Sequence, residues 1–240
     1  MQEDFCQATG TSPRIKYENE GGPGLMAMFT LAQQSLDAQR DLRTLMASQI
    51  LFWMLRAPDG HAKNFSIQLQ AGMAGRFRLT PIYDVMSALP VMGDGPNQWA
   101  PQEIKLAMAL LGKNRHDEMQ GIQRRHFNNT VQKVGYASTA EPIIEEILAR
   151  TPAAIAEVQS ELPQDFSPRV LDAILGGLEQ AARGIAQAGQ GAKGADHGGL
   201  RQHRAEHDRQ DKPAKAADQP DQVDAQVEEG SDHRGDQGGE

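Results

Sequence analysis

The residues best suited to chemistry lie in one short polar segment, APDGHAKNF, at residues 57–65. An acid, Asp59, stands five positions before an amide, Asn64, and a further acid, Asp84, follows in PIYD. Phosphoryl transfer needs a carboxylate that accepts the proton of the attacking hydroxyl, and oxygen ligands for the Mg²⁺ that bridges the phosphates. Protein kinases supply these groups from an Asp-x-x-x-x-Asn loop and from a second Asp beyond a short hairpin. The spacing is therefore typical of a kinase catalytic site.

Each of these three residues also has a purely structural interpretation. Asp59 and Gly60 form a common turn pair, Asn64 is suited to pairing backbone groups, and Asp84 is an ordinary loop acid. A single Asp-x-x-x-x-Asn spacing is frequent by chance. The order of helix, loop, hairpin and Asp is more specific, so the three residues together favour a site.

Apolar periodicity predicts the elements that would position these residues. A short helix is expected over residues 25–34, and a longer buried helix over 37–55, which Pro58 ends. Alternating patterns at 65–70 and 76–80, joined by a turn that contains glycine, predict a β-hairpin. Further helices are expected at 102–111, 117–134, 140–162 and 167–188. The third of these is expected to be kinked or broken near Pro152, and the last has Ser167 as its N-cap.

Composition divides the chain near residue 188. Every Phe, Trp and Tyr lies at or before Phe166, and residues 188–240 are rich in Gly, Ala, Gln and Asp. Such a segment buries too little apolar surface to offset its conformational entropy. Residues 1–187 are therefore predicted to form one domain, and residues 188–240 a disordered low-complexity tail. Four of the seven histidines fall in this tail, at spacings that fit no compact metal site.

Charge and cysteine content narrow the class of protein. The net charge is −8, and residues 188–240 carry 7 Lys and Arg against 12 Asp and Glu, so the rest is close to neutral and gives no case for direct nucleic-acid binding. The single cysteine, Cys6, excludes an internal disulfide and is expected to be a small buried hydrophobe in a reducing compartment. No apolar run approaches the ~20 residues of a membrane span, and the first ten residues do not resemble a signal peptide. We expect a cytoplasmic protein that does not engage membranes.

Six segments together carry a resemblance to a known family. DGHAKNFS, followed by RLTPIYDVMSALP and IKLAMAL, resembles the carboxy-terminal domain of the HipA-type serine/threonine kinases, the toxins of bacterial toxin–antitoxin pairs. QEDFCQATG, KYENEGGPG and RRHF resemble other segments of the same family, and the resemblance extends from the first residues to about residue 185. It implies a mainly α fold with a small β-hairpin, corresponding to the C-terminal, large lobe of a kinase.

The resemblance also implies roles for single residues. Asp59 corresponds to the proton-accepting aspartate, and ATP and Mg²⁺ would be the cofactors. Asn64 and Asp84 would be the metal ligands. The residues that would line the nucleotide are His61, Ala62, Lys63, Asn64, Tyr83 and Asp84. Gln2 is placed at the edge of the site. Lys63 suits phosphate charge, although a loop lysine is often simply solvated, and the role of His61 rests on the resemblance alone.

The family has two lobes with the nucleotide pocket between them, and this chain shows neither a Gly-rich phosphate loop nor a strand-borne lysine ahead of the long helix. We therefore expect the second lobe alone, with weak or no activity in isolation. The resemblance implies a HipB-like antitoxin as a partner, operator DNA contacted only through that antitoxin, and a protein substrate, with glutamyl-tRNA synthetase as the candidate.

The alternative is a non-catalytic interaction module that binds the antitoxin and, through it, operator DNA. The local basic residues are few, and a solvated helix face explains them better than a DNA contact does. They are Lys113, Arg115, Arg124, Arg125 and Lys133.

Overall fold

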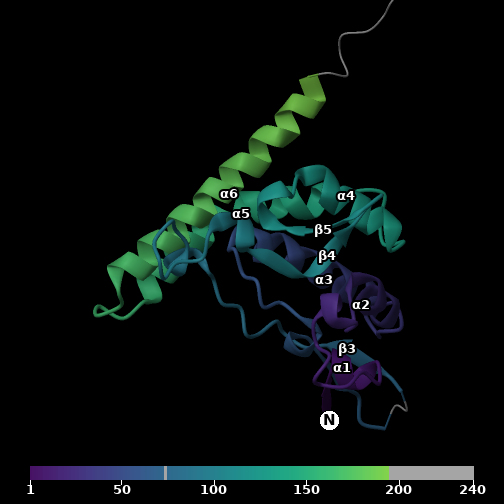
Figure 1. The fold of residues 1–240 in the computed structure, drawn as a ribbon. Helices are drawn as coiled ribbons and strands as arrows, with labels where there is room; N and C mark the ends of the chain where they lie inside the picture. Colours follow the sequence, from purple (N-terminus) through teal and green to yellow (C-terminus); the bar gives the residue numbers. More distant parts are fainter. Residues whose placement is uncertain (73–74, 195–240) are drawn as a thin grey trace, which may run out of the picture. The chain divides into compact units, whose positions relative to one another are not determined.

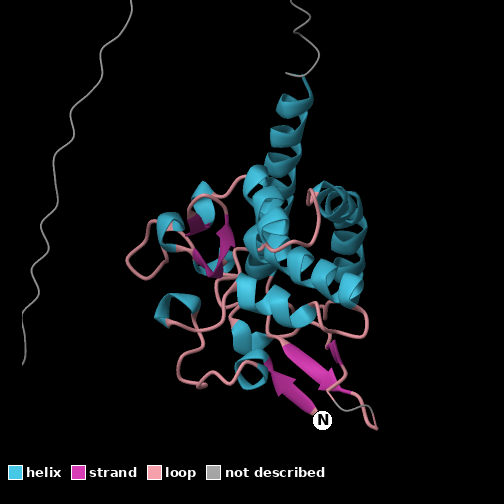
Figure 2. Ribbon diagram, turned by 90° about the vertical axis from the view of Figure 1, so that its right-hand side faces the viewer, coloured by secondary structure: helices cyan, strands magenta, loops and turns pink. Residues whose placement is uncertain are grey.

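Helices and two small antiparallel sheets form the computed structural model, which describes residues 1–72 and 75–194 within the first of two units, Met1–Gly199 (Figures 1 and 2). The helices are α1 (Phe5–Ala8), α2 (Leu25–Ala32), α3 (Ala38–Met54), α4 (Arg124–Lys133), α5 (Glu141–Glu161) and α6 (Pro168–Gly194). The strands are β1 (Gln2–Asp4), β2 (Ser66–Leu69), β3 (Phe77–Leu79), β4 (Lys105–Leu111) and β5 (Arg115–Glu118). Within these residues no helix is long and apolar enough to span a bilayer.

Helix α3 is the centre of the hydrophobic core. It packs against α2, α4, α5, α6 and β3, and its side chains Leu45, Met46 and Ile50 are fully buried. These residues are spaced one and four positions apart, so they lie on the same face of the helix, which is the face that packs against its neighbours. The predicted buried helix over residues 37–55 is confirmed, and it leads directly into the segment that begins at Ala57.

A buried carboxylate fixes the start of α3 to the first sheet. Asp41 is 2% exposed, and its Oδ2 accepts hydrogen bonds from the hydroxyl of Ser35 and from the backbone N–H of Leu79 at 2.8 Å. A buried charge is tolerated when donors satisfy it in this way. The contact ties α3 to β3 and so sets the position of the hairpin relative to the helix.

The first sheet has the strand order β1-β2-β3, and both pairings are antiparallel. Glu3 of β1 lies opposite Ile67 of β2, which in turn lies opposite Leu79 of β3. The predicted hairpin at 65–70 and 76–80 is confirmed. Strand β1 is an addition that the sequence did not predict. Cys6 follows it in α1 and is fully buried, as expected.

The prediction of a helix over residues 102–111 is wrong. Most of these residues form β4, Lys105–Leu111, which pairs with β5 in a second antiparallel hairpin with an irregular register between Lys105 and Leu110. Leu106, Met108 and Leu110 alternate along the strand and are buried, whereas Lys105 is exposed. The predicted helix over 117–134 is likewise shorter than expected, because β5 extends to Glu118, a 3-10 turn covers Met119–Gly121, and α4 begins only at Arg124.

Helices α5 and α6 lie side by side at the carboxyl end of the described chain (Figure 1). Helix α5 is one continuous element with Pro152 inside it, so the predicted break does not occur. Helix α6 begins at Pro168, as the sequence predicts, and the carbonyl of Ser167 accepts the N–H of Leu171 at 3.1 Å. It continues past the predicted boundary at residue 188 to Gly194, and residues 195–240 of the predicted tail lie outside the described residues.

Candidate phosphoryl-transfer site

The segment after α3 is a loop closed by its own hydrogen bonds. The carbonyl of Asp59 accepts the side-chain amide of Asn64 at 2.6 Å and the backbone N–H of His61 at 2.9 Å. The N–H of Asn64 donates in turn to the carbonyl of His61 at 2.9 Å. The first and last residues of the Asp-x-x-x-x-Asn spacing are therefore joined directly, and the loop has one defined shape.

A close contact with α3 makes Gly60 necessary in this loop. A Cβ atom at Gly60 would lie 2.3 Å from Cε2 of Phe52, which is far inside van der Waals contact. Phe52 is itself buried, packing against Phe65 with ring centroids 5.9 Å apart. Only a residue without a side chain lets the loop lie on this aromatic pair.

The carboxylate of Asp59 is partly exposed and held by a distant tyrosine. Its side chain is 33% exposed, and Oδ1 accepts the phenolic hydrogen of Tyr17 at 2.7 Å. Nε2 of His61 lies 3.5 Å from the same oxygen. Both contacts fall on Oδ1, so among the described residues Oδ2 has no hydrogen-bond partner and can accept a further hydrogen bond.

His61 supports Asp59 from within the protein. His61 is 3% exposed, and its ring packs edge-on against the ring of Tyr17, with the two ring centroids 5.0 Å apart. The Nδ1 atom of His61 has no hydrogen-bond partner among the described residues. Burial lowers the pKa of His61 from its ordinary 6.5, against the opposing charges of Asp59 and, more weakly, Asp84. The imidazole is therefore neutral at neutral pH.

Tyr83 connects the second element of the predicted site to the loop. Its hydroxyl donates to the carbonyl of Lys63 at 2.8 Å and contacts the hydroxyl of Ser66 at 2.7 Å. Since the phenol has one hydrogen, Ser66 is the donor in the second bond. Ala62 is buried and Lys63 half-buried, so among these residues Lys63 is the one that can present charge to a ligand.

Asp84 is exposed and has a left-handed backbone. Its φ is 57°, and besides Arg56 at 51° it is the one non-glycine residue with positive φ in the described chain. Such conformations are strained and cluster at functional sites. The segment that follows is tied to the end of α3, because Ser87 Oγ donates to the carbonyl of Leu55 at 2.6 Å and the N–H of Ala88 to that of Arg56 at 3.0 Å.

Asn64 and Asp84 carry the oxygen atoms that Mg²⁺ prefers as ligands, and their role as its ligands stays a prediction. The Asn64 amide nitrogen is used within the loop, which leaves its oxygen available as a ligand. In the described chain no group of three or more His, Cys, Asp or Glu side chains is placed to hold a metal. Mg²⁺ does not need such a cage, because it retains several waters and takes one or two protein ligands together with phosphate oxygens.

Two residues at this site had no predicted role. Tyr17 donates a hydrogen bond to Asp59. The ammonium of Lys16 lies 5.0 Å from the centroid of the Tyr17 ring, and its charge lowers the pKa of His61. Both belong to the KYENEGGPG segment, where the family resemblance was the available signal. Gln2, in contrast, pairs with Gln68 at the exposed end of the first sheet.

A groove opens beside Asp59. It has a volume of about 580 Å³ and is lined by Tyr17, Asp59, Met86, Val91 and Trp99 among others. Met86 and Trp99 are 61% and 52% exposed, so the carboxylate faces an apolar surface.

A buried helix that runs into a closed Asp-x-x-x-x-Asn loop, followed by a hairpin and an exposed aspartate, is the arrangement of a protein kinase's large lobe. The comparisons agree with this class. Residues 1–155 match the family described as the HipA-like C-terminal domain, and the chain belongs to that family. The fold class expected from the sequence is thereby confirmed.

Two relatives show how the chain compares with longer proteins. It is 36% identical over 89 residues to "Putative kinase Y4mE" of Sinorhizobium fredii (strain NBRC 101917 / NGR234), a match that covers 37% of this chain and 20% of the relative. Its fold resembles HipA from Shewanella oneidensis MR-1, solved with HipB and operator DNA, with a TM-score of 0.66 and 20% identity. That match covers 80% of this chain and 45% of the other. The chain thus spans less than half of either protein.

Proposed function

We propose that this chain is the catalytic lobe of a HipA-type serine/threonine protein kinase, which transfers the γ-phosphate of ATP to a serine of a protein substrate. The observation that carries the proposal is the placement of Asp59. Its carboxylate is partly exposed, one oxygen is held by Tyr17 and the other is free, and Asn64 is bonded into the same loop. The strained and exposed Asp84 supplies a second carboxylate.

In this proposal Asp59 accepts the proton of the serine hydroxyl through Oδ2 while Tyr17 and His61 fix its orientation. Asn64 and Asp84 would hold Mg²⁺, which when bound neutralises charge on the transferring phosphoryl group. Lys63 within the loop and Lys16, whose charge acts on His61, add positive charge. Tyr83 holds the carbonyl of Lys63 and so keeps the loop and the Asp84 segment together.

Phosphoryl transfer depends almost entirely on positioning and charge stabilisation. The family's nucleotide pocket lies between two lobes, and the residues of this chain would form one wall of it. We therefore expect the chain by itself to bind Mg-ATP weakly and to turn over slowly.

Two measurements on the purified chain test this function. Mg-ATP binding is followed by calorimetry, and phosphate transfer from γ-labelled ATP to protein is followed in parallel. Asp84→Asn should weaken Mg-ATP binding at least tenfold, whereas Asp94→Asn, which neutralises an exposed loop acid, should not change it. Asp59→Asn should retain Mg-ATP binding and abolish transfer. Transfer that survives Asp59→Asn, or Mg-ATP binding indifferent to Asp84→Asn, would overturn the proposal.

A second role is favoured by one comparison. The solved structure that this fold resembles contains HipA together with HipB and operator DNA. We propose that this chain likewise binds a HipB-like antitoxin of the helix-turn-helix class and reaches DNA only through it. Co-purification with such a protein from the same genome tests this. Antitoxin binding by a chain that does not bind Mg-ATP would favour the interaction module over the kinase.

A further inference from the structure

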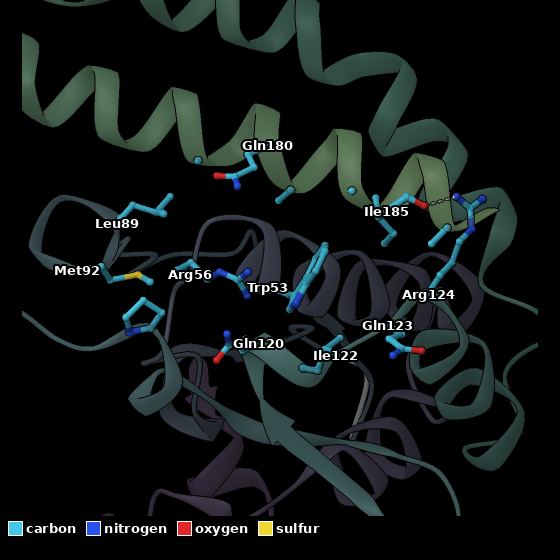
Figure 3. Close-up of a pocket in the computed structure, with 15 residues that line it drawn as sticks. Trp53, Arg56, Leu89, Met92, Gln120, Ile122, Gln123, Arg124, Gln180 and Ile185 are labelled. Carbon is cyan, nitrogen blue, oxygen red and sulfur yellow. Dashed lines mark hydrogen bonds between the residues drawn. The ribbon is translucent and has the colours of Figure 1, made fainter. Parts of the chain in front are cut away.

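A second pocket lies between α6 and the carboxyl end of α3 (Figure 3). Its volume is about 600 Å³, within the ~300–1,000 Å³ typical of small-molecule sites. Trp53, Ile122 and Ile185 line it with apolar side chains that are 8%, 5% and 3% exposed. None of the residues proposed to act in phosphoryl transfer lines it.

The space exists because the facing side of α6 carries small residues. Gly177, Ala181, Gly184 and Ala188 all line the pocket, and they follow one another at spacings of three or four along one face of the helix. A Cβ atom at Gly184 would meet nothing within 4 Å. The pocket is therefore wide enough to admit a ligand at this point of α6.

Arg56 brings an unpaired positive charge into this pocket. Its Nη1 donates to the carbonyl of Met119 at 3.1 Å, and its guanidinium carbon lies 5.4 Å from the centroid of the Trp53 ring. Among the described residues no carboxylate lies within ion-pair distance of it. Arg124, in the same pocket, differs in being paired with Glu141 and Glu145.

The surroundings of Arg56 do not favour a bare charge. Burial lowers the pKa of its guanidinium, yet an arginine stays protonated in proteins. Its backbone, with φ at 51°, is in the left-handed region that glycine prefers after a helix. The dipole of α3 attracts a cation to its carboxyl end. This attraction alone does not explain why Arg56 is half-buried, because an exposed arginine would gain it as well. A half-buried cation at a strained position is expected where it serves a ligand.

We propose that this pocket binds a small amphipathic carboxylate, with its apolar body on Trp53, Ile122 and Ile185 and its carboxylate on Arg56. The free edge of the guanidinium can take a carboxylate in a paired geometry. The side chains of Gln120 and Gln180, at the exposed rim, provide additional amide donors (Figure 3). An inorganic phosphate has no apolar part that could cover Trp53, Ile122 and Ile185.

A ligand in this pocket would contact the segments next to the loop at residues 57–65 and next to Asp84. Arg56 precedes Asp59 by three positions, and its carbonyl accepts the N–H of Ala88 at 3.0 Å. Leu89, next to Ala88, also lines the pocket. A ligand on Arg56 would thus contact both segments that carry the proposed kinase residues.

The test uses the whole chain labelled with ¹⁵N and follows the indole N–H resonances of its two tryptophans. Trp53 lies in the pocket, whereas Trp99 lines the groove beside Asp59 and serves as the internal control. The probes are 2-naphthoate, its uncharged analogue 2-naphthalenemethanol, and inorganic phosphate. We expect 2-naphthoate to shift the Trp53 resonance saturably, the alcohol to bind at least about tenfold more weakly, since a hydrogen bond to a charged group is lost, and phosphate to leave the resonance unchanged.

Two variants assign the site. Arg56→Gln should lower the affinity for 2-naphthoate at least about tenfold. Gly184→Leu should abolish binding by filling the pocket, and leucine is a better helix former than glycine, so α6 should be retained. Circular dichroism checks the fold of both. The proposal is overturned if 2-naphthoate leaves Trp53 unshifted, if the alcohol or phosphate binds equally well, or if a folded Arg56→Gln variant keeps wild-type affinity. The comparison of probes on the unmodified chain stands even if a variant does not fold.

Discussion

The phenol of Tyr17 donates a 2.7 Å hydrogen bond to Oδ1 of Asp59 across 42 residues of sequence. This bond is the main reason that the pKa of Tyr17 is raised to about 12. It joins the loop that precedes α2 to the loop that follows α3. Asp59 therefore owes its orientation to two separate segments of the chain.

The first prediction concerns the ionisation of Tyr17. Titration of tyrosine absorbance at 295 nm should show one group with a pKa near 12, and Tyr17→Phe should remove that transition. Asp59→Asn should return it toward the ordinary value of 10.0, because the accepting carboxylate is gone. The folded chain keeps the proton to a higher pH than the unfolded one, so this stabilisation is complete below pH 10 and is lost as the pH rises through 12. A transition near 12 that persists in Tyr17→Phe would contradict the assignment.

The second prediction concerns the contact between Gly60 and Phe52. Gly60→Ala places a methyl group 2.3 Å from the Phe52 ring, and relief of such overpacking typically costs about 1–3 kcal/mol. Urea denaturation should show this loss of unfolding free energy. Gly121→Ala is the matched control, because a Cβ there meets nothing within 4 Å. Equal stability of the two variants would show that the loop does not rest on Phe52.

The third prediction concerns His61 and acid. Because burial lowers its pKa, the folded chain binds this proton less readily than the unfolded chain. The contribution of neutral His61 to stability is therefore present above its ordinary pKa of 6.5 and is lost as the pH falls below it. The midpoint of the His61 imidazole titration, followed by NMR, should lie below pH 6.5, and His61→Gln should lessen the loss of stability at acidic pH. Titration of His61 at or above pH 6.5 would disprove this.

The candidate site was predictable from sequence because its parts are local. Asp59 and Asn64 belong to one turn, and the helix and hairpin around them have clear apolar periods. Tyr17 was not predictable as their partner, since a contact across 42 residues depends on how α2 and α3 pack. The pocket at Arg56 could not be predicted either, because it is assembled from five separate segments of the chain.

The error at residues 102–111 has a physical cause. KLAMALL consists of residues with high helix propensity, and propensity is a weak prior that tertiary context overrides. Here Leu106, Met108 and Leu110 face the core every second residue, and alanines between them conceal the alternation. Pairing with β5 then decides the conformation. Strand β1 has no such pattern and forms only because β2 lies beside it.

The fourth prediction concerns the joint between the last three helices. Arg124 of α4 is 6% exposed, binds Glu141 and Glu145 of α5, and donates to the carbonyl of Ile185 in α6 at 3.0 Å. Removing one partner of a fully buried ion pair costs about 3–5 kcal/mol. The two carboxylates are 35% and 56% exposed and can be solvated, so we expect Arg124→Met to lose roughly 2–3 kcal/mol of unfolding free energy in urea.

The neighbouring Arg125 is exposed and provides the control for charge. Arg125→Met removes the same positive charge from the same helix, and we expect a change within about 0.5 kcal/mol. Amide hydrogen exchange should separate the two variants further, because α6 loses its bond at Ile185 only in Arg124→Met. If both variants lose the same stability, net charge rather than the contacts of Arg124 holds the three helices together.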